Sequence, residues 1–142
     1  MMLKYTYLKG KCLFWKETYF IFVEYENDKL AELFSDLNDV KHSNHLLQKN
    51  IGFDLTRSIK KRYNQILSCS SFKELQQSGL GKPESLSGNF TGCFSLRLTA
   101  NYRLIVKPCS KDLSAESLMN CDTVIIKGVI DYHGKGNDWI IP

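Results

Sequence analysis

The sequence predicts an α+β domain in which helices from the first half of the chain cover one face of a β-sheet. Between residues 27 and 78, apolar side chains recur at helical spacing. In the last third, the runs 93–98, 102–107 and 123–133 alternate apolar with polar residues or are rich in β-branched ones. An amphipathic helix must bury its apolar stripe, and a sheet offers the surface for this.

The composition is that of one globular domain. The chain has 142 residues, of which 43% are hydrophobic and 24% charged, which suffices for one core. Its five cysteines contain no CxxC pair, which disfavours a zinc ribbon or a disulfide framework. No run approaches the ~20 apolar residues of a membrane span. We expect a cytoplasmic protein without membrane association, with an N-terminal extension (residues 1–18) and a single domain (residues 19–142).

Positive charge is concentrated in the later part of the chain. Residues 57–142 contain twelve Lys and Arg against seven Asp and Glu, whereas residues 1–56 contain seven against eight. This excess fits an RNA or another acidic partner. A basic surface that merely keeps the protein soluble explains the charge equally well.

The first elements expected are a strand and a helix. Residues 19–25 (YFIFVEY) are aromatic and β-branched, as in a largely buried strand. Asn27 and Asp28 then offer N-cap oxygens. One apolar stripe follows and predicts an amphipathic helix, whose continuation through Leu46 and Leu47 stays open: Leu30, Leu33, Phe34, Leu37 and Val40.

A second helix is predicted to begin near Asp54, and a short third helix covers residues 72–77. The apolar face of the second helix consists of Leu55, Ile59, Tyr63, Ile66 and Leu67. Its opposite face is basic and contains Arg57, Lys60, Lys61 and Asn64. A solvated helix face accounts for these charges as well as an RNA surface does.

Residues 79–92 are rich in Gly, Ser, Pro and Asn and predict a loop. A hairpin follows, joined by Thr99, Ala100 and Asn101, in which Asn101 is expected to be left-handed. This three-residue connection places Leu96 opposite Leu104 and Arg97 opposite Arg103. Two opposed arginines repel each other unless an anion lies between them, so the pair indicates a phosphate site or two arginines splayed into water.

Residues 108–122 predict a polar inserted loop, and residues 123–133 a final strand. An apolar tail, Trp139 to Ile141, must pack on the domain or bind a partner. Period-two alternation places Asp131 and His133 on one side of the strand and Tyr132 on the other, although a bulge would re-aim Tyr132. With the helices on the apolar face, the remaining face is expected to carry Ser95, Arg97, Arg103, Asp131 and His133.

These side chains suit the cleavage of RNA by its own 2′-hydroxyl. That reaction requires a base near the hydroxyl, positive charge on the phosphate and an acid for the leaving oxygen. We expect His133, the two arginines, and Tyr132 or Asp131 to supply these parts.

The stretch LSGNFTGCFSLRLTANYRLIVKP (residues 86–108), followed by VIIKGVIDYHGK (residues 124–135), resembles the HigB-like plasmid-maintenance killer toxins of the RelE/ParE superfamily. The shared features are a leucine-glycine loop, an FS-x-R strand, a YRL strand and a terminal DYH. Upstream, KLAELFSDLNDV and IGFDLTRSIKKRYNQIL are similar to the paired helices of this group. The resemblance covers roughly residues 20–135.

The resemblance implies a RelE-like fold, in which two N-terminal helices pack on one face of an antiparallel twisted β-sheet. It implies the toxin of a type II toxin-antitoxin system, an RNA endonuclease that cleaves mRNA on the ribosome by acid-base chemistry without a metal or another cofactor. The implied partner is a helix-turn-helix antitoxin. By position, the expected catalytic residues are Asp131, Tyr132, His133, Arg97 and Arg103. The expected RNA contacts are Arg57, Lys60, Lys61, Lys82 and Lys135.

One departure from the family pattern keeps an alternative open. Many relatives have a histidine two residues before the loop leucine, where this chain has Glu84. A ParE-like toxin without nuclease activity, or an inactive binding module on the same fold, is the alternative. A metal hydrolase has less support, since His42-x-x-His45 lacks an adjacent glutamate and a third ligand.

Overall fold

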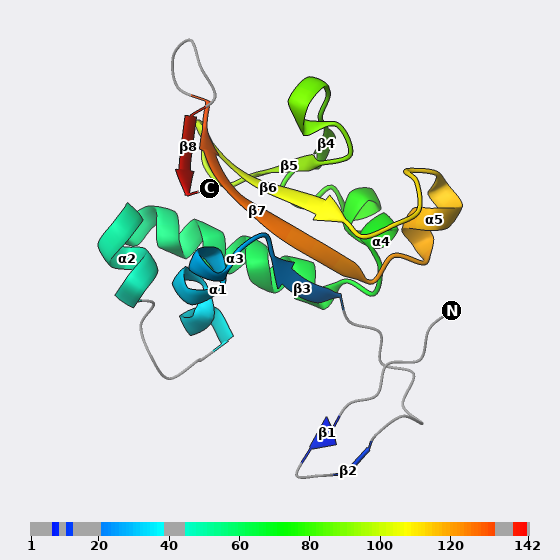
Figure 1. Cartoon of the computed structure of the whole chain (residues 1–142), viewed down its shortest axis with the longest axis horizontal. Coiled ribbons are helices and arrows are strands. Elements are labelled where there is room, and N and C mark those ends of the chain that lie inside the picture. The colour runs from blue at the N-terminus through cyan, green and yellow to red at the C-terminus, as the bar shows by residue number, and fades with distance from the viewer. Residues whose placement is uncertain (1–6, 9–10, 13–20, 39–44, 133–137, 142) are drawn as a thin grey trace.

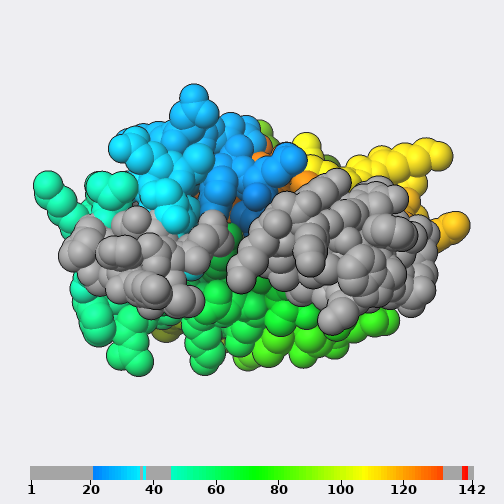
Figure 2. All heavy atoms as spheres, turned by 90° about the horizontal axis from the view of Figure 1, so that it is seen from below, coloured from blue at the N-terminus to red at the C-terminus, as the bar shows by residue number. Residues whose placement is uncertain are grey.

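The computed structural model describes residues 7–8, 11–12, 21–38, 45–132 and 138–141. Helices pack on one face of a β-sheet, so the predicted α+β class is confirmed (Figure 1). Figure 2, seen from the helical side, shows α1, α2 and α3 side by side. His42, His133 and Lys135, which the sequence singled out, lie outside the described residues.

Within these residues, six strands form one sheet in the order β3-β7-β6-β5-β4, with β8 added to β7. Their bounds are β3 Phe22–Tyr25, β4 Glu84–Ser85, β5 Phe94–Arg97, β6 Tyr102–Pro108, β7 Thr123–Asp131 and β8 Asp138–Ile141. The pairs are antiparallel as expected, except that β3 runs parallel to β7. Two short strands, β1 (Tyr7–Leu8) and β2 (Lys11–Cys12), pair with each other.

The helices follow the predicted apolar pattern with one correction. The Asn27 side chain accepts a hydrogen bond from the Leu30 amide at 2.9 Å and caps α1 (Asp28–Leu33). The expected long first helix is wrong, because α1 ends there and a 3-10 turn, η1 (Ser35–Asn38), follows it. Leu46 and Leu47, into which the first helix was left free to continue, belong to a separate helix, α2 (His45–Ile51). The other two predicted helices are α3 (Phe53–Ser68) and α4 (Phe72–Ser78).

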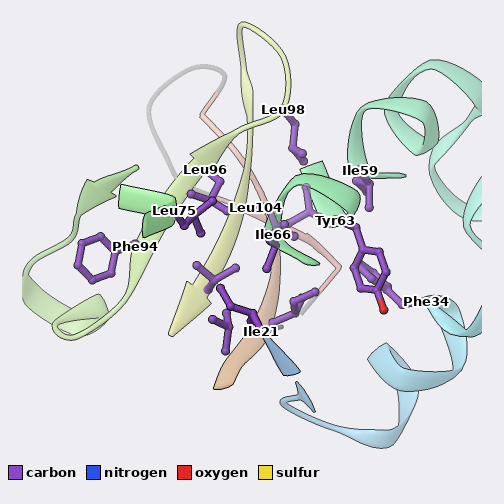
Figure 3. Close-up of a cluster of buried hydrophobic side chains, with 14 of the residues drawn as sticks. Ile21, Phe34, Ile59, Tyr63, Ile66, Leu75, Phe94, Leu96, Leu98 and Leu104 are labelled. Carbon is purple, nitrogen blue, oxygen red and sulfur yellow. The ribbon is translucent and has the colours of Figure 1, made fainter. Parts of the chain in front are cut away.

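The main core lies between the helices and the sheet (Figure 3). The apolar face of α3 contributes Ile59, Tyr63 and Ile66, each at most 4% exposed. From β5 and β6, Leu96 and Leu104 meet them and are fully buried. Burying each such aliphatic side chain contributes about 1.5–3 kcal/mol, so this interface fixes which face of the sheet is covered.

Three regions read from sequence as loop or tail contain regular structure. The 79–92 segment includes β4, which pairs with β5, and a 3-10 turn, η2 (Gly88–Phe90). The inserted loop includes α5 (Ala115–Met119), and its Leu118 is 2% exposed. The apolar tail forms β8 on the edge of β7. β4 and α5 are short and lie in segments rich in polar and turn residues, which is why local composition did not reveal them.

No helix in the described part of the chain is long and apolar enough to cross a membrane.

The expected left-handed conformation of Asn101 is wrong. Among the described residues, the non-glycine residue with positive φ is Lys82, with φ of 46°. The hairpin is instead stabilised by Thr99, whose hydroxyl accepts from the amides of Asn101 and Tyr102.

Candidate active site

Two arginines face each other across the β5–β6 hairpin. Arg97 pairs with Arg103, and Leu96 pairs with Leu104, so the predicted register is confirmed. Since both leucines lie in the main core, the arginines belong to the opposite face, which we call the second face. Two positive charges of this face therefore lie at the loop end of the hairpin.

The Arg103 side chain is held in place by the hairpin itself. Its Nη1 donates to the carbonyl oxygens of Thr99 at 2.9 Å, Ala100 at 3.2 Å and Tyr102 at 3.1 Å. Its Cζ lies 5.0 Å from the centroid of the Tyr132 ring, a cation–π contact. These carbonyl dipoles and the ring reduce the repulsion between the two arginines. The guanidinium is thus fixed in position, and within the described residues its nitrogens other than Nη1 donate no hydrogen bond and can bind an anion.

Tyr132 lies on the second face, beside Arg103, and the prediction that it points the other way is wrong. Its amide donates to the Asn101 carbonyl at 2.7 Å. Its ring packs against a small buried cluster formed by Cys93, Ile105 and Ile130. The half-buried ring leaves Tyr132 accessible next to the arginines.

A β-bulge explains why the prediction failed. On β6, Val106 pairs with Ile126 but Ile105 pairs with Gly128, so Lys127 is an extra residue in β7. Gly128 has φ of 143°, a conformation that favours glycine. One inserted residue exchanges the faces of every residue that follows it. Ile130, and after it Tyr132, therefore share the face of Arg103.

Asp131 is consequently not beside the arginines. It pairs with Tyr102, whose ring packs against the main core, so its carboxyl belongs to the helical face. Ser95 does lie on the second face but is 1% exposed and cannot line an open groove. The structure therefore brings together Arg97, Arg103 and Tyr132 from the predicted set.

Glu84 brings a carboxylate to the second face that sequence reasoning treated only as a lost histidine. It pairs with Ser95, so its side chain shares the face of Arg97, and it is exposed. A diagonal neighbour of this kind is separated by about 7–8 Å between Cα atoms. Leu86, two residues on, packs against the second-face cluster, and this apolar anchor was the signal that the segment forms a strand.

Arg62 is a second residue that the sequence did not single out. Its Nε donates to the Arg97 carbonyl at 2.9 Å, and its Nη1 donates to Gln65 Oε1. Burial lowers the pKa of the Arg62 guanidinium. The Arg97 amide in turn donates to the Gly81 carbonyl at 2.7 Å. Arg62 thus connects α3 to the strand end that presents Arg97.

The residues predicted to bind RNA lie in two separate regions of the surface, one on α3 and one near the arginine pair. Arg57, Lys60 and Lys61 line a groove of about 540 Å³ along α3, with Asp54, Ser58 and Asn64. Because Ile59 and Tyr63 of the same helix face the sheet, this groove faces away from the arginine pair. Lys82 is exposed and follows Gly81, whose carbonyl binds the Arg97 amide, so it lies near the pair.

No protein-family description and no curated protein matches this sequence. Among solved structures, the chain is similar to the YoeB-YefM complex from Staphylococcus aureus, with 18% identity, coverage of 80% of this chain and 98% of that chain, and a TM-score of 0.44. It is similar to a heterotetrameric YoeB-YefM toxin-antitoxin complex from the same organism, with equal identity and coverage and a TM-score of 0.43. These values describe a distant similarity, so the functional assignment depends on the site.

Proposed function

We propose that this chain is the toxin of a type II toxin-antitoxin system and a cytoplasmic endonuclease that cleaves mRNA on the ribosome. The observation that carries the proposal is the fixed Arg103 guanidinium, beside Arg97 and against the Tyr132 ring. A phosphate placed between the two arginines would remove their repulsion. Such a pair provides the positive charge that a phosphate requires as its negative charge grows during cleavage.

The proposed reaction needs only groups that the chain supplies. A base removes the proton of the 2′-hydroxyl, and the 2′-oxygen attacks phosphorus. The bond from phosphorus to the 5′-oxygen breaks, and an acid protonates that oxygen. The products are a 2′,3′-cyclic phosphate and a 5′-hydroxyl, so atoms and charges balance without an external reactant.

We assign the parts as follows. Arg103 and Arg97 bind the scissile phosphate, and the Tyr132 hydroxyl protonates or orients the leaving oxygen. Glu84 is proposed as the base, because the strand register places its carboxylate on the arginine face, diagonal to Arg97. His133, the next residue after Tyr132, keeps the acid-base role that the family resemblance implies. Asp131 receives no direct role, because it shares the face of Tyr102.

Two partners belong to the proposal. The basic groove on α3, lined by Arg57, Lys60 and Lys61, would bind phosphates of mRNA or ribosomal RNA away from the cleavage site. The antitoxin, expected to contain a helix-turn-helix, would neutralise the chain by covering its site. Lys82 and Lys135 are further proposed RNA contacts, the latter from sequence alone.

The proposal is tested by inducing the chain in a bacterial host and mapping transcript ends by primer extension. We expect growth arrest and new ends at discrete positions in translated messages. Arrest without new ends would contradict the proposed nuclease activity.

A ParE-like toxin without nuclease activity, or an inactive binding module, is the second candidate. One observation favours it: Asp131 and Tyr132 of the DYH motif lie on opposite faces, so the motif does not form a single cluster of catalytic groups. This candidate predicts arrest with DNA damage signalling, or no arrest, and intact mRNA in each case.

A further inference from the structure

An aromatic pair on the second face is not used by the proposed chemistry. The rings of Phe90, in η2, and Trp139, in β8, have centroids 5.6 Å apart and an interplanar angle of 62°. Phe90 packs against the second-face cluster, whereas Trp139 is 37% exposed. The pair therefore presents an indole that is supported on one side and open to solvent on another.

The strand register places this indole in line with the arginines. Trp139 pairs with Ile130, Ile130 pairs with Arg103, and Arg103 pairs with Arg97. These four residues form one row across β8, β7, β6 and β5. Adjacent strands are about 4.8 Å apart, so the Trp139 backbone lies about 10 Å from that of Arg103. This distance is within the reach of a nucleotide whose phosphate is bound by Arg103.

We propose that Trp139, supported edge-on by Phe90, stacks on an unpaired base of RNA whose adjoining phosphate is bound by Arg103. This inference rests on the proposed function and specifies the substrate as single-stranded. A flat, partly exposed indole beside fixed guanidinium charge is the combination with which proteins bind single strands without reading their sequence.

The charges around the indole favour a nucleic acid over an apolar protein partner. Arg103 and Arg97 lie in the row itself. Farther from the indole, the same face carries the exposed Lys107, opposite Ile125 of β7, and two exposed carboxylates, Glu84 on β4 and Glu24 opposite Ile125 on β3. Lys127, at the bulge, is 2.9 Å from Glu26 and is thereby partly neutralised. An apolar helix or strand placed on the row would bring no negative charge to Arg97 and Arg103, whereas a phosphate backbone supplies it.

The test uses the fluorescence of Trp139 in the full-length chain. The chain has two tryptophans, so Trp15→Phe leaves Trp139 as the sole reporter. This variant is titrated with a short single-stranded RNA and with an abasic oligonucleotide of equal length and charge. We expect the RNA to quench Trp139 emission and the abasic oligonucleotide to bind more weakly, with little quenching.

The affinity of the RNA gives a second readout through fluorescence anisotropy of a dye on the oligonucleotide. Losing one stacked base weakens binding by about tenfold for Trp139→Leu. Trp139→Phe should retain most of the affinity, because it keeps an aromatic ring. Leu113→Ala is the control for loss of an exposed apolar side chain, since Leu113 is 41% exposed in the inserted loop between β6 and β7 and not part of the row.

Several outcomes would overturn the inference. Equal quenching by the abasic oligonucleotide would show that charge, not stacking, acts on Trp139. The inference would also be refuted by unchanged RNA affinity in a folded Trp139→Leu variant or by the absence of any RNA binding. A change in Trp139 emission with the antitoxin but not with RNA would refute it as well. If the wild-type chain cleaves mRNA but RNA does not change Trp139 emission, the stacking inference is refuted and the endonuclease proposal stands. If quenching occurs without any mRNA cleavage, the endonuclease proposal fails instead.

Discussion

The Arg103 guanidinium carbon lies 5.0 Å from the centroid of the Tyr132 ring, and Nη1 of the same group donates to three carbonyls of the hairpin. The cation is therefore positioned before any ligand arrives. Such preorganisation reduces the reorganisation needed when charge develops on a bound phosphate. Tyr132 serves both as support for Arg103 and as a source of a hydroxyl.

These two contributions of Tyr132 can be separated. Tyr132→Phe keeps the ring under Arg103 but removes the hydroxyl, and we expect mRNA cleavage on purified ribosomes to slow by about 10²–10⁴-fold, as for loss of a general acid. Tyr132→Ala should also weaken RNA binding. Wild-type cleavage by Tyr132→Phe would exclude the hydroxyl from the reaction.

The strand register makes opposite predictions for two carboxylates. Glu84→Gln should slow cleavage by roughly 10²-fold or more, because Glu84 shares the face of Arg97 and is the proposed base. Asp131→Asn should leave the single-turnover rate within about a factor of ten, which corresponds to 1.4 kcal/mol, provided that thermal unfolding shows an intact fold. A larger loss for Asp131→Asn than for Glu84→Gln would refute the assignment.

The link between Arg62 and the loop before β4 can be measured as stability. In Gly81→Ala, the new Cβ would lie 2.9 Å from Arg62 Cδ at φ of 74°, so we expect the free energy of unfolding to fall by about 1–3 kcal/mol. Gly79→Ala is the control, since it has φ of 70° but no heavy atom within 4 Å of the new Cβ. Equal losses in urea unfolding would show that the Arg62 contact adds nothing.

The α3 groove predicts a salt effect without an effect on chemistry. Exchanging Arg57 and Lys61 for Gln should reduce the slope of log affinity against log salt by about 0.7 for each lost phosphate contact with single-stranded RNA. The exposed Lys111, in the inserted loop, is the control. An unchanged slope for the double variant would show that the α3 groove contacts no phosphate and that RNA binds at the second face alone.

Two features set by local sequence were predicted correctly, although the length of the first helix and the conformation of Asn101 were not. The Arg97–Arg103 register follows from a three-residue connection, and the α3 face follows from helical spacing. The face that carries Arg97 and Arg103 was predicted, but which of Asp131 and Tyr132 shares it was not, because this depends on the single extra residue Lys127 in β7. The pairing of Glu84 with Ser95 was not predicted, because residues 79–92 were interpreted as a loop. A loop has no strand register, so the face of Glu84 could not be assigned from the sequence.

Cleavage of mRNA on purified ribosomes by Arg103→Ala tests whether the Arg103 guanidinium binds the scissile phosphate. Removing one fixed donor to a developing charge typically slows a reaction by about 10²–10³-fold, so we expect a loss of this size in the cleavage rate. The rate of Arg103→Lys should be intermediate, and that of Lys111→Ala should equal wild type. Circular dichroism establishes that the variants fold. Wild-type cleavage by a folded Arg103→Ala variant would contradict the proposal that this guanidinium binds the scissile phosphate.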